Sequence, residues 1–329
     1  MLLTRRSWMR NAAAATTAAL VPAQLRAAES DKALVAITLD LEMSRNFPTW
    51  ETTHWDYEKG NLNDETKRYT TAAAKRVKAA GGVLHCFAVG RVFEQADVTW
   101  LKEIVEAGHP VGNHTYDHIN VTAARPEDLQ FRFQRAPWLL RGQSVAEAIR
   151  ENVVLTNLAM KSRLGMEPAG FRTPGGFRDG LREHPAVRAI LKDLGFKWIS
   201  SLYPPHPNSA AMEEPSAEVL DSIVAALPKA QPFAYSDDLI EVPMSPISDI
   251  GAFRTGRWRL EWFLRAIRLC VEWTIENRAV FDFLAHPSCL YVVDPEFRAI
   301  DLICDLVRKA GPRAALVDLG TIAKRAVGR

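Results

Sequence analysis

Short apolar runs alternate with longer amphipathic segments along most of the chain, and this alternation constrains the fold more than any other feature. The run at 33–39 is continuously apolar and ends in polar residues, which is typical of a strand buried on both faces of a parallel sheet. The other predicted strands are 83–89, 110–112, 169–171, 196–199, 239–244 and 280–285. The predicted helices between and after them are 65–80, 96–107, 144–164, 186–194, 258–277 and 296–309.

Strands that alternate with helices imply right-handed βαβ units and a parallel sheet. About seven such units favour a single-domain α/β barrel over an open sheet. The composition, 47% hydrophobic and 24% charged, is that of a globular protein and excludes disorder for most of the chain. The net charge of +2 gives no reason to expect nucleic acid or a membrane surface as a partner.

The first 28 residues have the layout of a secretory signal. The pair Arg5-Arg6 precedes an Ala-rich, mildly apolar stretch at 12–22, and small residues follow at Ala27 and Ala28. This order predicts a twin-arginine signal peptide over 1–28 and a mature catalytic domain over 29–329, exported to the periplasm or cell surface. The apolar stretch is too short to predict a transmembrane segment.

Side chains able to do chemistry follow several of the predicted strands. Active sites of α/β barrels gather at the C-terminal ends of the strands, so we expect these side chains to meet in one site. They are Asp40, Glu42, His114, His118, Arg172 and His286. The four cysteines have no CxxC spacing, which argues against a cysteine zinc site.

The histidine and carboxylate spacings suit a metal ion. His114 and His118 are four residues apart, which on a helical turn would place both imidazoles on one face. Asp40 and Glu42 are two apart, so both side chains fall on one side of an extended chain. One carboxylate can complete a two-histidine, one-carboxylate metal face, and the other can take a proton from a bound water. Solvated loop side chains are the alternative for both pairs.

Two further residues have a possible catalytic use. Arg172 lies in a Pro-Gly turn, where a fixed guanidinium can hold a carboxylate; the alternative is an ordinary surface arginine. His286 ends a strongly apolar run and can protonate a leaving amine. The alternative for His286 is a core histidine with a backbone partner.

Taken together, these segments resemble the polysaccharide deacetylases, the NodB-homology group of carbohydrate esterases (family 4-like). The resemblance runs from about residue 34 to 286. The family's segments appear in order as Thr-Leu-Asp-Leu-Glu at 38–42, Asn-His-Thr-Tyr-Asp-His at 113–118, Arg-Thr-Pro at 172–174 and Leu-Ala-His at 284–286.

The resemblance implies a distorted (β/α) barrel with fewer than eight strands and one divalent metal ion, commonly zinc. It implies that Asp40 is the general base, oriented by Arg172, and that His286 is the general acid. It also implies that His114 and His118 are metal ligands.

The chain departs from the family pattern at two places. Leu41 stands where the family has a metal-binding Asp, and we expect Glu42 to replace it as the third metal ligand. The segment expected to supply an Asp that supports His286 has none at 197–201, which leaves Asp237 and Asp249 as candidates.

These observations predict a metal-dependent hydrolase of non-peptide carbon–nitrogen bonds. Its predicted reaction is the removal of N-acetyl groups from a polysaccharide or peptidoglycan-type amino sugar, so its predicted partner is an N-acetylated glycan. Two alternatives stay open. The first is an allantoinase-like hydrolase of a cyclic amide or imide, with or without metal. The second is a glycan-binding protein that keeps the fold and has lost its activity.

Overall fold

A computed structural model describes residues 32–53 and 58–327. The predicted signal peptide at 1–28 lies outside the described residues. Within the described part of the chain, no helix is long and apolar enough to cross a membrane.

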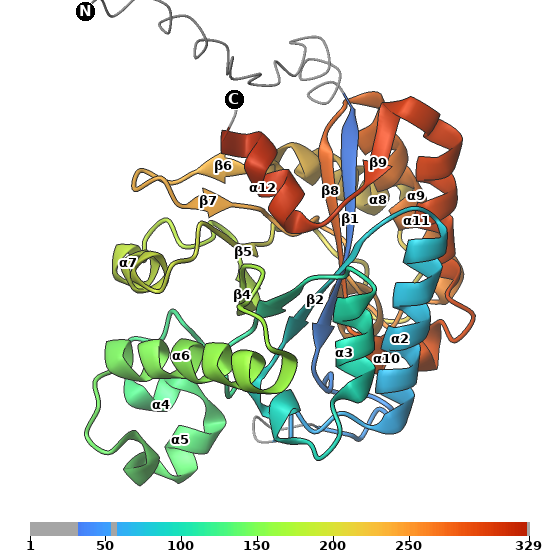
Figure 1. Cartoon of the computed structure of the whole chain (residues 1–329). Coiled ribbons are helices and arrows are strands. Elements are labelled where there is room, and N and C mark those ends of the chain that lie inside the picture. The colour runs from blue at the N-terminus through green and yellow to red at the C-terminus, as the bar shows by residue number, and fades with distance from the viewer. Residues whose placement is uncertain (1–31, 54–57, 328–329) are drawn as a thin grey trace, which may run out of the picture. The chain divides into compact units, whose positions relative to one another are not determined.

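Nine strands of the described chain form one sheet in the order β6-β7-β5-β4-β3-β2-β1-β8, and β9 pairs with the start of β1 (Figure 1). All the pairings are parallel except that of β6 with β7. The strands are β1 (Ala33–Leu41), β2 (Leu84–Ala88), β3 (Val111–Asn113), β4 (Phe171–Phe177), β5 (Trp198–Leu202), β6 (Phe233–Ala234), β7 (Ile240–Glu241), β8 (Val280–Ala285) and β9 (Ala314–Leu316).

The segment after β7 brings the two ends of this curved sheet together. Ser245 N donates to Asp282 O (3.1 Å), and Ser248 forms an isolated parallel bridge with Leu284 of β8. An irregular segment therefore stands in place of a regular closing strand. The predicted fold class, a distorted α/β barrel in a single domain, is confirmed.

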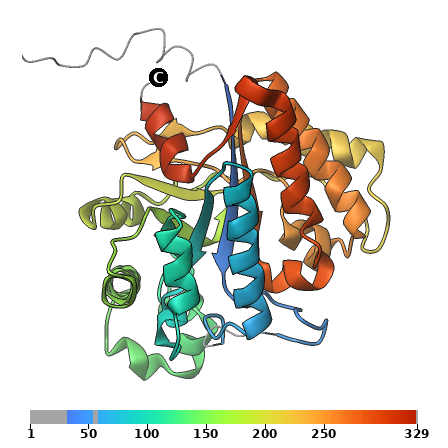
Figure 2. The ribbon, with the colours of Figure 1, turned by 45° about the vertical axis from the view of Figure 1, so that its right-hand side comes forward.

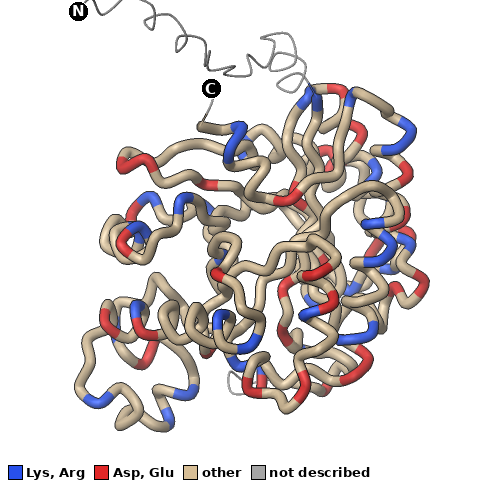
Figure 3. Tube along the Cα trace, in the orientation of Figure 1, with Lys and Arg blue, Asp and Glu red and all other residues tan. Residues whose placement is uncertain are grey.

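Helices cover the outside of the sheet. In Figure 1 and Figure 2, α2, α9 and α11 pack against the side that carries β1, and their apolar faces form the largest core cluster together with that strand. The helices are α2 (Asp64–Ala79), α3 (Thr99–Glu106), α4 (Pro126–Leu129), α5 (Phe131–Arg135), α6 (Val145–Leu164), α7 (Pro185–Asp193), α8 (Ala217–Ala226), α9 (Leu260–Glu276), α10 (Pro287–Val293), α11 (Arg298–Ala310) and α12 (Leu319–Val327). Figure 3 shows both signs of charge interspersed over them, in keeping with the small net charge.

Local sequence explains where the best-predicted helices begin and end. Asn63 accepts from Thr66 N (2.9 Å) at the start of α2, and Ser144 forms a reciprocal capping box with Glu147 at the start of α6. Gly165 ends α6 at φ 71°, a left-handed conformation that favours glycine.

Other boundaries differ from the prediction. The helix predicted at 96–107 begins only at Thr99, the predicted strand 239–244 is reduced to two residues in β7, and β4 extends far beyond 171. The elements α4, α5, α8, α10, α12, β6 and β9 were not predicted. Most of them are too short to show a clear hydrophobic period.

Candidate active site

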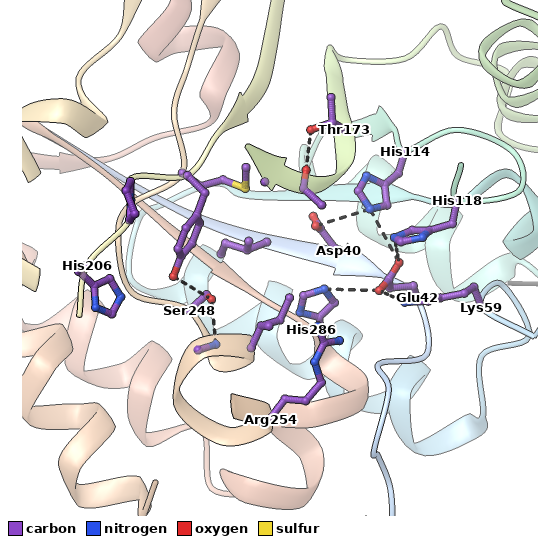
Figure 4. Close-up of a pocket in the computed structure, with 18 of the residues that line it drawn as sticks. Asp40, Glu42, Lys59, His114, His118, Thr173, His206, Ser248, Arg254 and His286 are labelled. Atoms are coloured by element: carbon purple, nitrogen blue, oxygen red, sulfur yellow. Dashed lines mark hydrogen bonds and ion pairs between the residues drawn. The ribbon is translucent and has the colours of Figure 1, made fainter. Parts of the chain in front are cut away.

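A cavity of about 500 Å³ opens at the C-terminal ends of the strands, and all of the candidate side chains except Arg172 line it (Figure 4). Asp40 is near the end of β1 and Glu42 just after it, while His114 and His118 follow β3. His286 directly follows β8. The predicted convergence of these side chains at one barrel end is therefore what the structure shows.

Glu42, His114 and His118 form a three-residue cluster whose ligand atoms all lie within 4.8 Å of one another. Glu42 Oε2 is 2.6 Å from His118 Nε2 and 3.8 Å from His114 Nε2. This oxygen is buried and has no well-formed hydrogen bond among the described residues. His114 Nδ1 lies 3.0 Å from the Arg172 carbonyl, and an N–H donated there leaves Nε2 with a lone pair that faces the cluster. This donor set fits a divalent ion of the zinc type.

A loop, and not the predicted helical turn, brings the two imidazoles together. Residues 114–118 are irregular, and Thr115 and His118 have left-handed φ values of 58° and 56°. Asn113 Oδ1 accepts from Thr115 N (2.8 Å) and stabilises the first bend. The two histidines lie together as the spacing predicted, but through a different local geometry.

Asp117, inside this loop, is held by two arginines. Its Oδ1 accepts from Arg91 Nε (2.6 Å) and from Arg132 Nη1 (2.7 Å). Its backbone N–H donates to Asn152 Oδ1 of α6 (2.8 Å). These contacts fasten the histidine loop to three separate elements, and the sequence did not predict them.

Lys59 is a member of the site that sequence reasoning missed. Its Nζ lies 2.6 Å from Glu42 Oε1, and both side chains are buried. Burial works to raise the pKa of Glu42, but His118 and Lys59 hold that pKa well below its usual value. Burial lowers the pKa of His118 to about 4 and also lowers that of His114, so both imidazoles are neutral at pH 7. Neutral imidazoles are the form that binds metal.

Arg172 lies in β4 and is completely buried, so neither the predicted turn nor the surface alternative is right for it. Nη1 donates to Asp40 Oδ1 (3.0 Å), and Nη2 donates to Asp282 Oδ2 (2.5 Å). Asp282 also accepts from Thr38 Oγ1 (2.8 Å). The expected contact between Arg172 and Asp40 is present. Asp282 was missed, although a lone acid inside the apolar run of β8 was visible in the sequence.

His286 is supported by Asp249. Nδ1 lies 3.0 Å from Asp249 Oδ1, and the backbone N–H of His286 donates to Asp249 Oδ2 (2.8 Å). Burial opposes protonation, but Asp249 and the nearby Glu42 raise the pKa of His286 above its usual value. Nε2 lies 3.6 Å from Glu42 Oε1, on the cavity side. The other candidate, Asp237, pairs instead with Arg188.

Comparison with known proteins agrees with this geometry. The family model "Polysaccharide deacetylase" matches residues 57–199, a span that contains His114, His118 and Arg172 but not Asp40, Glu42 or His286. Residues 57–199 of this chain belong to the polysaccharide deacetylase family. The predicted family is therefore confirmed, together with its enzyme class, hydrolases of non-peptide carbon–nitrogen bonds.

Two solved structures share the fold of this deacetylase domain. A Mycobacterium smegmatis protein described as a polysaccharide deacetylase is 15% identical, with 91% of each chain covered and a TM-score of 0.58. The PuuE allantoinase is 13% identical, with 90% of each chain covered and a TM-score of 0.55. A search of curated proteins found no match.

Proposed function

We propose that this protein is an exported, metal-dependent hydrolase that removes N-acetyl groups from an amino-sugar polymer. The observation that carries the proposal is the Glu42–His114–His118 cluster. Its Glu42 Oε2 is buried, has no hydrogen bond from the residues that the structure describes, and faces two neutral imidazoles. A divalent ion, with zinc as the first choice, would bind there. When bound, such an ion polarises the acyl carbonyl and acidifies a water molecule.

Asp40 has the position of a general base. Its Oδ1 is engaged by Arg172, while Oδ2 is 3.7 Å from His114 Nε2 and therefore borders the cluster. That free oxygen can accept the proton of an attacking water. Arg172 holds the carboxylate in one orientation and offsets its charge in the barrel interior.

His286 has the position of a general acid. Asp249 accepts the Nδ1 proton, which leaves Nε2 to carry a second proton toward the cavity. A nitrogen that leaves from the acyl carbon needs that proton, because an amide anion is a very poor leaving group. Asp40 and His286 thus both border the cluster (Figure 4).

The test is metal content by elemental analysis, followed by acetate release from N-acetylglucosamine oligomers. We expect one divalent ion per wild-type chain and a loss of both ion and acetate release in His114→Ala. The matched control is His184→Ala, because that histidine precedes α7 and does not line the cavity. Full metal content in Glu42→Ala would show that Glu42 is not a ligand. Export would be checked separately, by fusing residues 1–28 to a reporter.

The Lys59 ammonium favours one second candidate. At 2.6 Å from Glu42 it offsets the charge of this carboxylate without any ion, as a metal-free site requires. That candidate is a metal-free hydrolase of a small cyclic amide on the same barrel. Wild-type protein that binds no ion after zinc is supplied, yet opens a cyclic amide, would replace the first proposal with this one.

A further inference from the structure

Arg254 is a charged side chain of the cavity that the reaction above does not use. It lies on the single π-helical turn η4 (Ile250–Thr255), is half-buried, and points into the cavity toward His286 (Figure 4). Asp249, the partner of His286, directly precedes this turn. Single π-turns are rare and are found frequently at functional sites.

The other cavity side chains with a full charge already have partners of opposite sign. Asp40 is paired with Arg172, and Glu42 is paired with Lys59. Among the residues that the structure describes, Arg254 has no carboxylate within ion-pair distance and no hydrogen-bond acceptor. A half-buried guanidinium with five free N–H donors binds most favourably an anion that matches its planar geometry. A carboxylate matches it, because its two oxygens accept two parallel hydrogen bonds.

The position of Arg254 determines which part of a substrate it would touch. A general acid at His286 delivers its proton to the leaving nitrogen, so the amine portion of the substrate lies on the His286 side of the cavity. Arg254 lies on that same side. The acyl group lies instead near the Glu42 cluster, where its carbonyl is polarised.

We propose that Arg254 selects substrates whose amine portion carries a carboxylate, so that the preferred substrate is an acidic N-acylated amine and not a neutral one. This inference rests on the proposed function, since His286 as the acid defines the leaving-group side. The cavity of about 500 Å³ is large enough for one such unit beside the reacting amide.

The experiment compares N-acetylmuramic acid, its methyl ester and N-acetylglucosamine, which share the N-acetylated ring. The ester removes only the negative charge, and N-acetylglucosamine lacks the whole lactyl group. Affinity is measured by calorimetry and acetate release by a coupled assay. The variant is Arg254→Met, which keeps the unbranched apolar stem of the side chain without its charge. The matched control is Arg259→Met, an exposed arginine just before α9 that does not line the cavity.

We expect the wild type to bind the free acid about 10- to 100-fold more tightly than the ester or the neutral sugar, the range for a charge-assisted hydrogen bond. Arg254→Met should lose this preference, and Arg259→Met should keep it. Equal affinity for the three compounds in the wild type, or an unchanged preference in Arg254→Met, would overturn the inference. Absence of acetate release from all compounds would count against the proposed function alone, because the binding comparison decides the role of Arg254 without turnover.

Discussion

Replacing Arg172 with methionine is the most informative single perturbation of this barrel. Arg172 is completely buried, and its guanidinium reaches Asp40 at 3.0 Å and Asp282 at 2.5 Å. Arg172→Met leaves both buried carboxylates without their cation. Removal of one member of a buried ion pair costs about 3–5 kcal/mol, and most domains have only about 5–15 kcal/mol of stability in all.

The assay is urea unfolding of Arg172→Met, with Arg150→Met, at a partly exposed arginine, as the control. Arg150 pairs with Asp193 at the surface, and loss of such a pair costs about 1 kcal/mol or less. A double variant, Arg172→Met with Asp282→Asn, should be more stable than the sum of the two single losses predicts, because the second change removes a stranded charge. A loss below about 1 kcal/mol in Arg172→Met would refute the reasoning.

Three further outcomes are expected. Burial raises the pKa of Asp282 to about 6, so the folded state holds this proton more tightly than the unfolded chain does. The free energy of unfolding should therefore fall as the pH rises from about 4 to above 6. Asp282→Asn should remove that dependence on pH. Asp249→Asn removes the carboxylate that raises the pKa of His286, so the fall in rate at alkaline pH should begin at a lower pH. An unchanged pH dependence on the alkaline side would exclude His286 as the acid. Asp117→Asn weakens two arginine contacts at the histidine loop, so it should lower the free energy of unfolding by about 1–3 kcal/mol and should also lower the affinity for zinc. Its control is Asp128→Asn, at an exposed ion pair with Arg125, which should leave the affinity for zinc unchanged.

The sequence alone determined the class of fold and the side of the barrel on which chemistry occurs. Continuous apolar runs such as the one that became β1 can be buried only between two layers, and their alternation with helices leaves few topologies. Since parallel strands all end at one edge, the residues after each strand must meet there. This is why the sequence predicts Asp40, Glu42, His114 and His286 as neighbours.

Only the tertiary structure decided what surrounds those residues. Lys59 reaches Glu42 because the chain folds back so that Met43 N donates to Lys59 O (2.8 Å), and no local pattern encodes that return. Asp282 and Asp249 meet their partners across distant strands and an irregular closing segment. Such contacts depend on strand order, register and loop path, which are set by packing of the whole barrel. Local periodicity reports burial and element type, and it contains no information on which charged side chains will face each other across the cavity.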